Sequence, residues 1–308
     1  MSDYEKLQMT ADKGTGSFVR NLEGATGTGF AKDSHVHKDW YATTIDYDTA
    51  LDQAQRAVDE REDILAPVKD IEAILDDDGN FVFEVEGRQF APTNHAIEQF
   101  AIRTKVPSSS VMRELRNAKD YDDQDGDCMT RLANNALRRL DQDKEYRLRT
   151  YTDGTCRAFV TDKYAPIDNR WYLETLQEFL PDGRLSHWKG DEDTIFGNVL
   201  LPDTILDYGT DDDSDYGGMI SIGNCEIGKR RISQVPSLFR SICLNGCIWG
   251  QVSGKQIKRR HIGTIDLDAL KLEIGQNIEH QLPLLPNRIT KFLSITKFLS
   301  ITNFLFIT

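Results

Sequence analysis

The sequence predicts an α+β fold, in which helices pack on an antiparallel sheet. Of the 308 residues, 39% are hydrophobic, which is enough for a packed core. Short segments alternate apolar and polar residues around tight turns, as antiparallel strands do. Longer segments repeat apolar residues at helical spacing. We expect a flexible N-terminal arm over 1–45, a single α+β domain over 46–280 and a repetitive hydrophobic tail over 281–308.

The first half of the expected domain alternates between helices and short strands. Residues 48–65 predict a helix, because Leu51, Ala54, Val58 and Leu65 recur at helical spacing. After an acidic turn, residues 81–85 alternate like a strand. Thr93 is a typical N-cap for the next helix, and residues 129–140 predict another.

The second half begins with the clearest turn of the chain. Asp153-Gly154 joins strands over 146–152 and 156–161, since Asp-Gly favours a tight hairpin turn. Residues 169–180 and 267–278 predict helices, and Pro236 is expected to begin a short helix. Two strands are expected over 247–252 and 256–262.

Residues 93–115 also fit a helix-turn-helix that reads duplex DNA. The packing positions of that motif are occupied by Phe100, Val106, Val111 and Leu115. The turn position usually filled by Gly is Lys105, which would need a positive φ. An ordinary helical hairpin explains the same pattern, and we prefer that interpretation.

Composition and charge indicate a reduced, cytoplasmic, non-membrane protein. The net charge of −13 and the pI near 5.0 argue against indiscriminate coating of duplex DNA. The five cysteines are irregularly spaced, and no signal peptide is expected. Cys243 and Cys247 lack a second pair of Cys or His at suitable spacing, so we expect no metal and no cofactor.

One window departs from the acidic character of the chain. Residues 227–265 contain eight Lys or Arg and no Asp or Glu. Clustered cations attract phosphates through counterion release, so this window is the first candidate for a nucleic-acid site. Its basic residues are Lys229, Arg230, Arg231, Arg240, Lys255, Lys258, Arg259 and Arg260.

Two further features could contribute to binding of a single strand. In the hairpin, Arg147 and Arg149 share a strand face with Tyr151, which would combine charge with base stacking. A plain solvated face explains the same pattern. Trp249 in the basic window is a second stacking candidate, and burial in the core is an equal alternative for it.

Six motifs stand out in and upstream of the basic window. They are Asn224-Cys-Glu-Ile-Gly228, Val235-Pro-Ser-Leu-Phe-Arg240, Cys243-Leu-Asn-Gly-Cys-Ile-Trp-Gly250, Arg260-His-Ile-Gly263, Gly154-Thr-Cys-Arg-Ala-Phe-Val-Thr-Asp-Lys-Tyr164 and Ile167-Asp-Asn169. Together they resemble the phage- and plasmid-like protein family called domain of unknown function 932, over about residues 80–275. That family brings no settled activity, and its occurrence on phages and mobile elements implies DNA metabolism or conflict with the host.

Three functions remain open at this point. We favour binding or annealing of single-stranded DNA in recombination, as a homo-oligomer. The second is an enzyme acting on nucleic acid or a phosphorylated substrate, with Glu226 as general base, His261 as acid and Arg240 on an anion. The third is a phage protein that binds and inhibits a host defence factor through its acidic surface.

Overall fold

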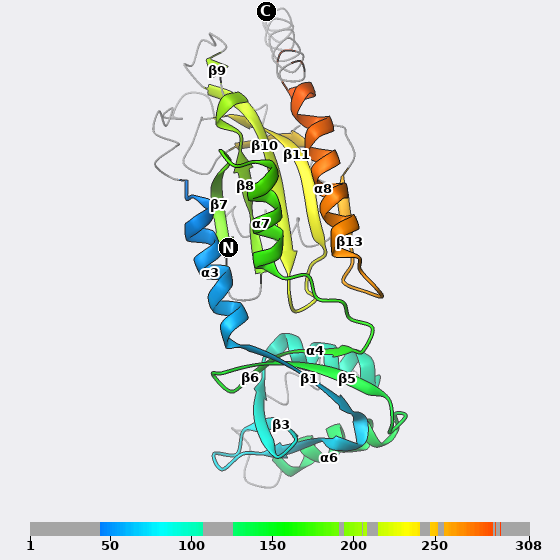
Figure 1. Ribbon diagram of the computed structural model, residues 1–308. Coiled ribbons are helices and arrows are strands. Elements are labelled where there is room, and N and C mark those ends of the chain that lie inside the picture. Colours follow the sequence, from blue (N-terminus) through cyan, green and yellow to red (C-terminus); the bar gives the residue numbers. More distant parts are fainter. Residues whose placement is uncertain are drawn as a thin grey trace, which may run out of the picture.

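The fold consists of two mostly antiparallel sheets with helices packed on them, which confirms the α+β class. The computed structural model describes residues 44–106, 126–190, 194–204, 206–207, 215–240, 247–251, 256–285, 287 and 290. The expected arm and the repetitive tail lie almost wholly outside these residues. Within the described part, five α-helices accompany a six-stranded and a seven-stranded sheet (Figure 1).

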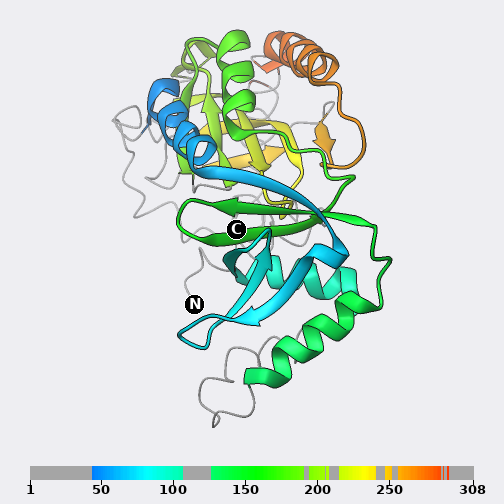
Figure 2. The same cartoon turned by 60° about the horizontal axis from the view of Figure 1, so that its bottom comes forward.

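The six-stranded sheet has the order β1-β5-β6-β4-β3-β2, and only its β4–β6 pair is parallel. Helices α4 (Asn94–Thr104) and α6 (Gly126–Arg138) lie with this sheet (Figure 2). Its core contains the aromatic residues Tyr146, Phe83, Phe100 and Phe159, with ring centroids 5.0–5.6 Å apart. The strands are β1 (Arg61–Pro67), β2 (Ile71–Leu75), β3 (Phe81–Val85), β4 (Arg88–Pro92), β5 (Glu145–Tyr151) and β6 (Thr155–Thr161).

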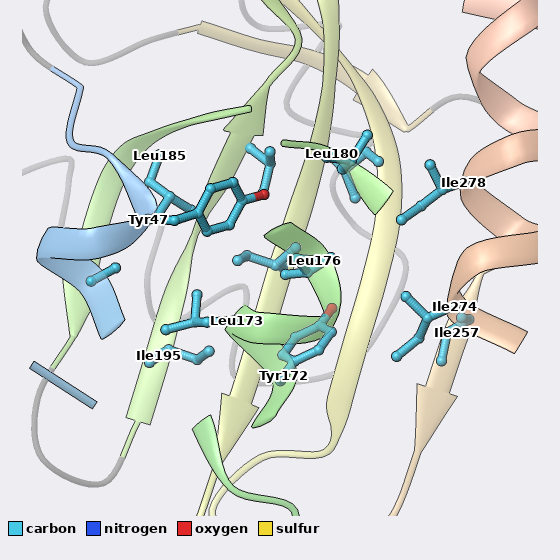
Figure 3. Packing of buried hydrophobic residues seen from close by; sticks show 14 of the residues in the cluster. Tyr47, Tyr172, Leu173, Leu176, Leu180, Leu185, Ile195, Ile257, Ile274 and Ile278 are labelled. Carbon is cyan, nitrogen blue, oxygen red and sulfur yellow. The ribbon is translucent and has the colours of Figure 1, made fainter. Parts of the chain in front are cut away.

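The seven-stranded sheet has the order β12-β11-β10-β8-β7, while β13 also pairs with β11 and β9 with β10. Helices α3 (Tyr47–Glu60), α7 (Asn169–Phe179) and α8 (Leu267–Gln281) cover one face (Figure 1). Figure 3 shows Tyr47, Leu173, Leu176 and Ile274 in the resulting core. The strands are β7 (Arg184–Gly190), β8 (Thr194–Leu200), β9 (Leu206–Asp207), β10 (Asp215–Cys225), β11 (Ile232–Arg240), β12 (Cys247–Gln251) and β13 (Ile257–Arg259).

Local signals located many elements correctly. The hairpin at Asp153-Gly154, the strand over 81–85 and helices α7 and α8 all form. The hydroxyl of Thr93 accepts the hydrogen bond from the Ala96 amide, so Thr93 is the N-cap of α4. Lys105 adopts φ 58° as the C-cap of α4. The second helix of the possible helix-turn-helix lies outside the described residues.

Two predicted helices are wrong in part or in full. Helix α3 ends at Glu60, and β1 follows at once and pairs with β5. The Leu65 side chain, assigned to a helical core face, is 44% exposed, because Ile64 and Ala66 point into the core instead. The expected helix at Pro236 is part of β11. Pro236 pairs with Ile220 of β10. On the other side of β11, it lies between the segment that pairs with β13 and the segment that pairs with β12, so its missing N–H removes no hydrogen bond to either of these two strands.

The contact between α7 and α8 gives a stability prediction. Gly275 of α8 is buried, and an added methyl would overlap the ring of Phe179. We expect Gly275→Ala to lower the free energy of unfolding by about 1–3 kcal/mol, the usual cost of overpacking. Gly-to-Ala changes in helices normally stabilise. Urea denaturation of this variant, with and without Phe179→Leu, checks the explanation: a gain in stability for the single variant would contradict it.

Candidate nucleic-acid interface

The fold brings together two basic triplets that are 26 residues apart along the chain. Residues 229–231 lie in the turn between β10 and β11, and residues 258–260 lie in and just after β13. Strands β11 and β13 pair, with Ser233 opposite Lys258 and Ile232 opposite Arg259. The triplets therefore meet at one edge of the seven-stranded sheet, beside α8 (Figure 1). We call this surface the basic edge; it comprises Lys229, Arg230, Arg231, Lys258, Arg259 and Arg260.

Most of the basic edge is open to solvent. Five of its six residues are exposed, and Arg230 is half-buried. The Arg230 guanidinium lies 5.6 Å from the ring centroid of Phe196. Arg259 forms an ion pair with Glu273 of α8 at 2.6 Å. The edge therefore presents clustered positive charge, and Glu273 is a carboxylate paired to it.

The turn that carries the first triplet is held by helix α4 of the other sheet. Gln99 donates a hydrogen bond to the carbonyl of Ile227 (2.8 Å) and accepts one from the Phe159 amide (2.8 Å). His95 Nε2 lies 3.0 Å from the same carbonyl, and Gly228 follows at φ 79°. A left-handed residue at this point is readily supplied by glycine. The cations at 229–231 thus project from an anchored turn.

Glu226, just before the turn, is the centre of a buried ion network. Its side chain is fully buried, and Oε1 accepts a hydrogen bond from the Asn169 amide at 2.6 Å. Oε2 pairs with Arg61 and lies 3.7 Å from Arg149 Nη1. Burial raises the pKa of the Glu226 carboxyl, against the lowering effect of Arg61 and Arg149.

Arg149 joins this network to the six-stranded sheet. Its Nε and Nη2 donate to the two carboxylate oxygens of Asp63 at 2.7 and 2.8 Å, and Nη1 donates to the Glu226 carbonyl at 2.7 Å. Burial tends to lower the pKa of Arg149, but the Asp63 carboxylate outweighs it and the pKa is raised. The pKa of Asp63 is lowered, because its hydrogen bonds to Arg149 and Arg147 outweigh burial. The pair is therefore charged.

The prediction that the hairpin presents a solvent-facing binding surface is wrong. Arg149 is 1% and Tyr151 3% exposed, because the turn after β10 packs on Arg149 and the Arg157 side chain packs on Tyr151. Arg147 is half-buried and pairs with Asp63 at 3.1 Å, while the guanidinium of Arg157 covers the Tyr151 ring at 3.9 Å. These side chains build the junction between the sheets and offer no solvent-facing strand surface.

Three other predicted residues have no described side chain. Arg240 ends β11 and Trp249 lies in β12, but only their backbones are described. Lys255 lies outside the described residues. Their proposed contacts therefore stay predictions.

The geometry does not favour the acid–base roles proposed for Glu226 and His261. Both residues contact Tyr164: its ring stacks on His261 (5.6 Å), and its hydroxyl donates to the backbone carbonyl of Glu226 (2.6 Å). Both carboxylate oxygens of Glu226 are already engaged. Burial lowers the pKa of His261 to about 4, so the ring is neutral near pH 7 and holds no acidic proton to donate.

The buried His261 predicts a pH dependence of stability. The side chain is 4% exposed, and neither ring nitrogen has a hydrogen-bond partner among the described residues. The unfolded chain binds the proton near pH 6.5 and the folded chain near pH 4. The neutral, buried His261 therefore favours the folded state fully above the pKa of the unfolded chain. As the pH falls from that pKa to the pKa of the folded chain, the free energy of unfolding decreases by about 3 kcal/mol.

Urea denaturation of wild type and His261→Phe over this pH range tests that loss. We expect the difference in free energy of unfolding between the two proteins to shift in favour of the variant by about 3 kcal/mol as the pH falls. The phenyl ring retains the stacking on Tyr164. A difference that stays constant with pH would contradict a neutral, buried His261.

Several residues of the site carried no recognisable signal in the sequence. Asp63 and Arg149 are 86 positions apart, and Gln99 and Ile227 are 128 positions apart. Phe196, under Arg230, belongs to an unremarkable strand. Only the tertiary fold brings these groups to the basic edge or to the turn and junction that hold it in place.

The comparisons with known protein families, curated proteins and solved structures gave no match. The resemblance to domain of unknown function 932 therefore stays a prediction. Among the described residues, no three His, Cys, Asp or Glu side chains are grouped as a metal site would require. No helix in the described ranges is long and apolar enough to cross a membrane.

Proposed function

We propose that this chain binds nucleic acid through the basic edge, as a DNA-binding protein of phage or mobile-element DNA metabolism. The observation that carries the proposal is the pairing of β11 with β13, which joins two exposed basic triplets into one surface. Lys and Arg neutralise backbone phosphates and release condensed counterions, so such a surface binds irrespective of base sequence.

The electrostatic setting supports a local contact. The chain as a whole carries a net charge of −13, so the basic edge is a local region of positive charge on an acidic chain. Glu226, which precedes the first triplet, is buried and paired with Arg61. An anchored turn loses little conformational entropy when it meets a phosphate. Single-strand binding or annealing by a homo-oligomer is the form of the proposal that we favour. The resemblance itself supports only a role in DNA metabolism or in conflict with the host.

Equilibrium binding to labelled single-stranded and duplex oligonucleotides across a salt series tests the proposal, without and with magnesium. We expect affinity to fall linearly with the logarithm of salt concentration while the oligonucleotide stays intact. Binding to neither form at low salt would overturn the proposal. Magnesium-dependent cleavage would instead indicate an enzyme.

A further inference from the structure

The basic edge continues onto the face of the seven-stranded sheet opposite α3, α7 and α8. Phe196 of β8, Gly223 of β10, Ser233 of β11 and Lys258 of β13 are successive partners across four strands. Directly paired residues of antiparallel strands point to the same face. Since neighbouring strands are about 4.8 Å apart, this row spans about 14 Å.

The row lies on the side of the sheet opposite the helices. The next positions along the strands, Ile195, Ile222 and Ile232, belong to the core beneath α3, α7 and α8. Because side chains alternate along a strand, Phe196, Gly223 and Ser233 point the other way. A Cβ at Gly223 would lie 3.7 Å from Phe196 Cδ2 and 3.0 Å from Ser233 Oγ, so the three residues are neighbours on this face.

The composition of the row is that of a small stacking platform beside a phosphate site. Phe196 and Ser233 are half-buried and Lys258 is exposed, while Gly223 between them is buried and carries no side chain. The Arg230 guanidinium also reaches the Phe196 ring. Proteins that bind single strands combine a cationic track for the backbone with aromatic rings on which bases stack.

We propose that the basic edge takes single-stranded DNA, with one base stacked on Phe196 while Arg230 and Lys258 contact the flanking phosphates. This inference rests on the proposed function and specifies its ligand. The bases of a duplex are stacked on one another inside the helix and cannot offer a free face to the ring. Phe196 is therefore the residue that makes the site prefer a single strand.

Binding of an oligo-dT strand and of an abasic strand of equal length tests this role of Phe196. We expect Phe196→Leu to weaken oligo-dT binding about 5- to 150-fold, the range for loss of one base–aromatic stack, and to leave abasic binding unchanged. The salt dependence, which reports phosphate contacts, should not change. Phe196→Tyr should restore the preference for dT, because it retains an aromatic face.

Phe81→Leu is the matched control, because Phe81 is also a half-buried Phe on a strand but lies in the six-stranded sheet. It should behave as wild type on both strands. Equal loss on dT and abasic strands in Phe196→Leu, or no loss, would overturn the stacking role and leave backbone binding by the basic edge intact. Binding of neither strand by wild type would overturn both proposals.

Discussion

The Arg149→Met variant is expected to lose about 3–5 kcal/mol of its free energy of unfolding, the cost of removing one partner from a buried ion pair. Arg149 is 1% exposed and donates to Asp63, on β1, and to the Glu226 carbonyl, at the turn after β10. Without the guanidinium, Asp63 keeps only Arg147 and Glu226 keeps only Arg61 as a positively charged partner in the junction. Methionine approximates the length of the side chain, so the loss reports charge more than volume.

Arg147→Met is the matched control for urea denaturation near neutral pH. Arg147 neighbours Arg149 on the same strand and also contacts Asp63, but its side chain is 24% exposed. Its removal should cost about 1 kcal/mol or less, as for partly solvated pairs. Similar losses in both variants would contradict the view that Arg149 holds the two sheets together.

Neutralising the basic edge should abolish most of the salt dependence of DNA binding. Replacing its two Lys and four Arg by Gln removes up to six phosphate contacts. For a single strand each contact contributes about 0.7 to the slope of log affinity against log salt, so the slope should fall by about 4. Titration of labelled oligo-dT across a salt series measures the change.

A second variant separates the site from net charge. It replaces two Lys and four Arg that are exposed on the six-stranded sheet and its helices, so both variants change the total charge equally. This control should retain the wild-type slope. Equal loss of binding in the two variants would indicate a diffuse electrostatic effect and contradict a localised interface. The control positions are Lys69, Arg88, Arg131, Arg138, Arg139 and Lys144.

Features with a local physical cause were predictable from the sequence. Asp153-Gly154 specifies its own turn, and Thr93 caps α4 with its own hydroxyl. The helical spacing of apolar residues was also enough to predict α7 and α8. The two segments that failed, β1 and β11, take their conformation from sheet pairing: β1 pairs with the distant β5, and β11 pairs with β10, which precedes it in the chain. There the helical spacing of Leu65 and the helix-start signal of Pro236 were outweighed by sheet pairing.

In the candidate site, too, local features were predictable from the sequence, whereas the effects of sheet pairing were not. Lys229–Arg231 and Lys258–Arg260 were recognisable as basic triplets, but their meeting depends on the register of β11 and β13. The alternation of Arg147, Arg149 and Tyr151 suggested a solvated face, yet the turn after β10 and the Arg157 side chain pack on that face. A sequence shows that residues share a face of a strand, and only the sheet around it determines whether that face meets solvent.

Chemical labelling of lysines in the presence of saturating oligo-dT tests the location of the interface most directly. Lys229 and Lys258 are both exposed on the basic edge, while Lys69 and Lys144 are exposed on the six-stranded sheet side. We predict that bound DNA protects Lys229 and Lys258 from acetylation and leaves Lys69 and Lys144 as reactive as in the free protein. Unchanged labelling of Lys229 and Lys258 while DNA is bound would contradict the basic edge as the binding surface.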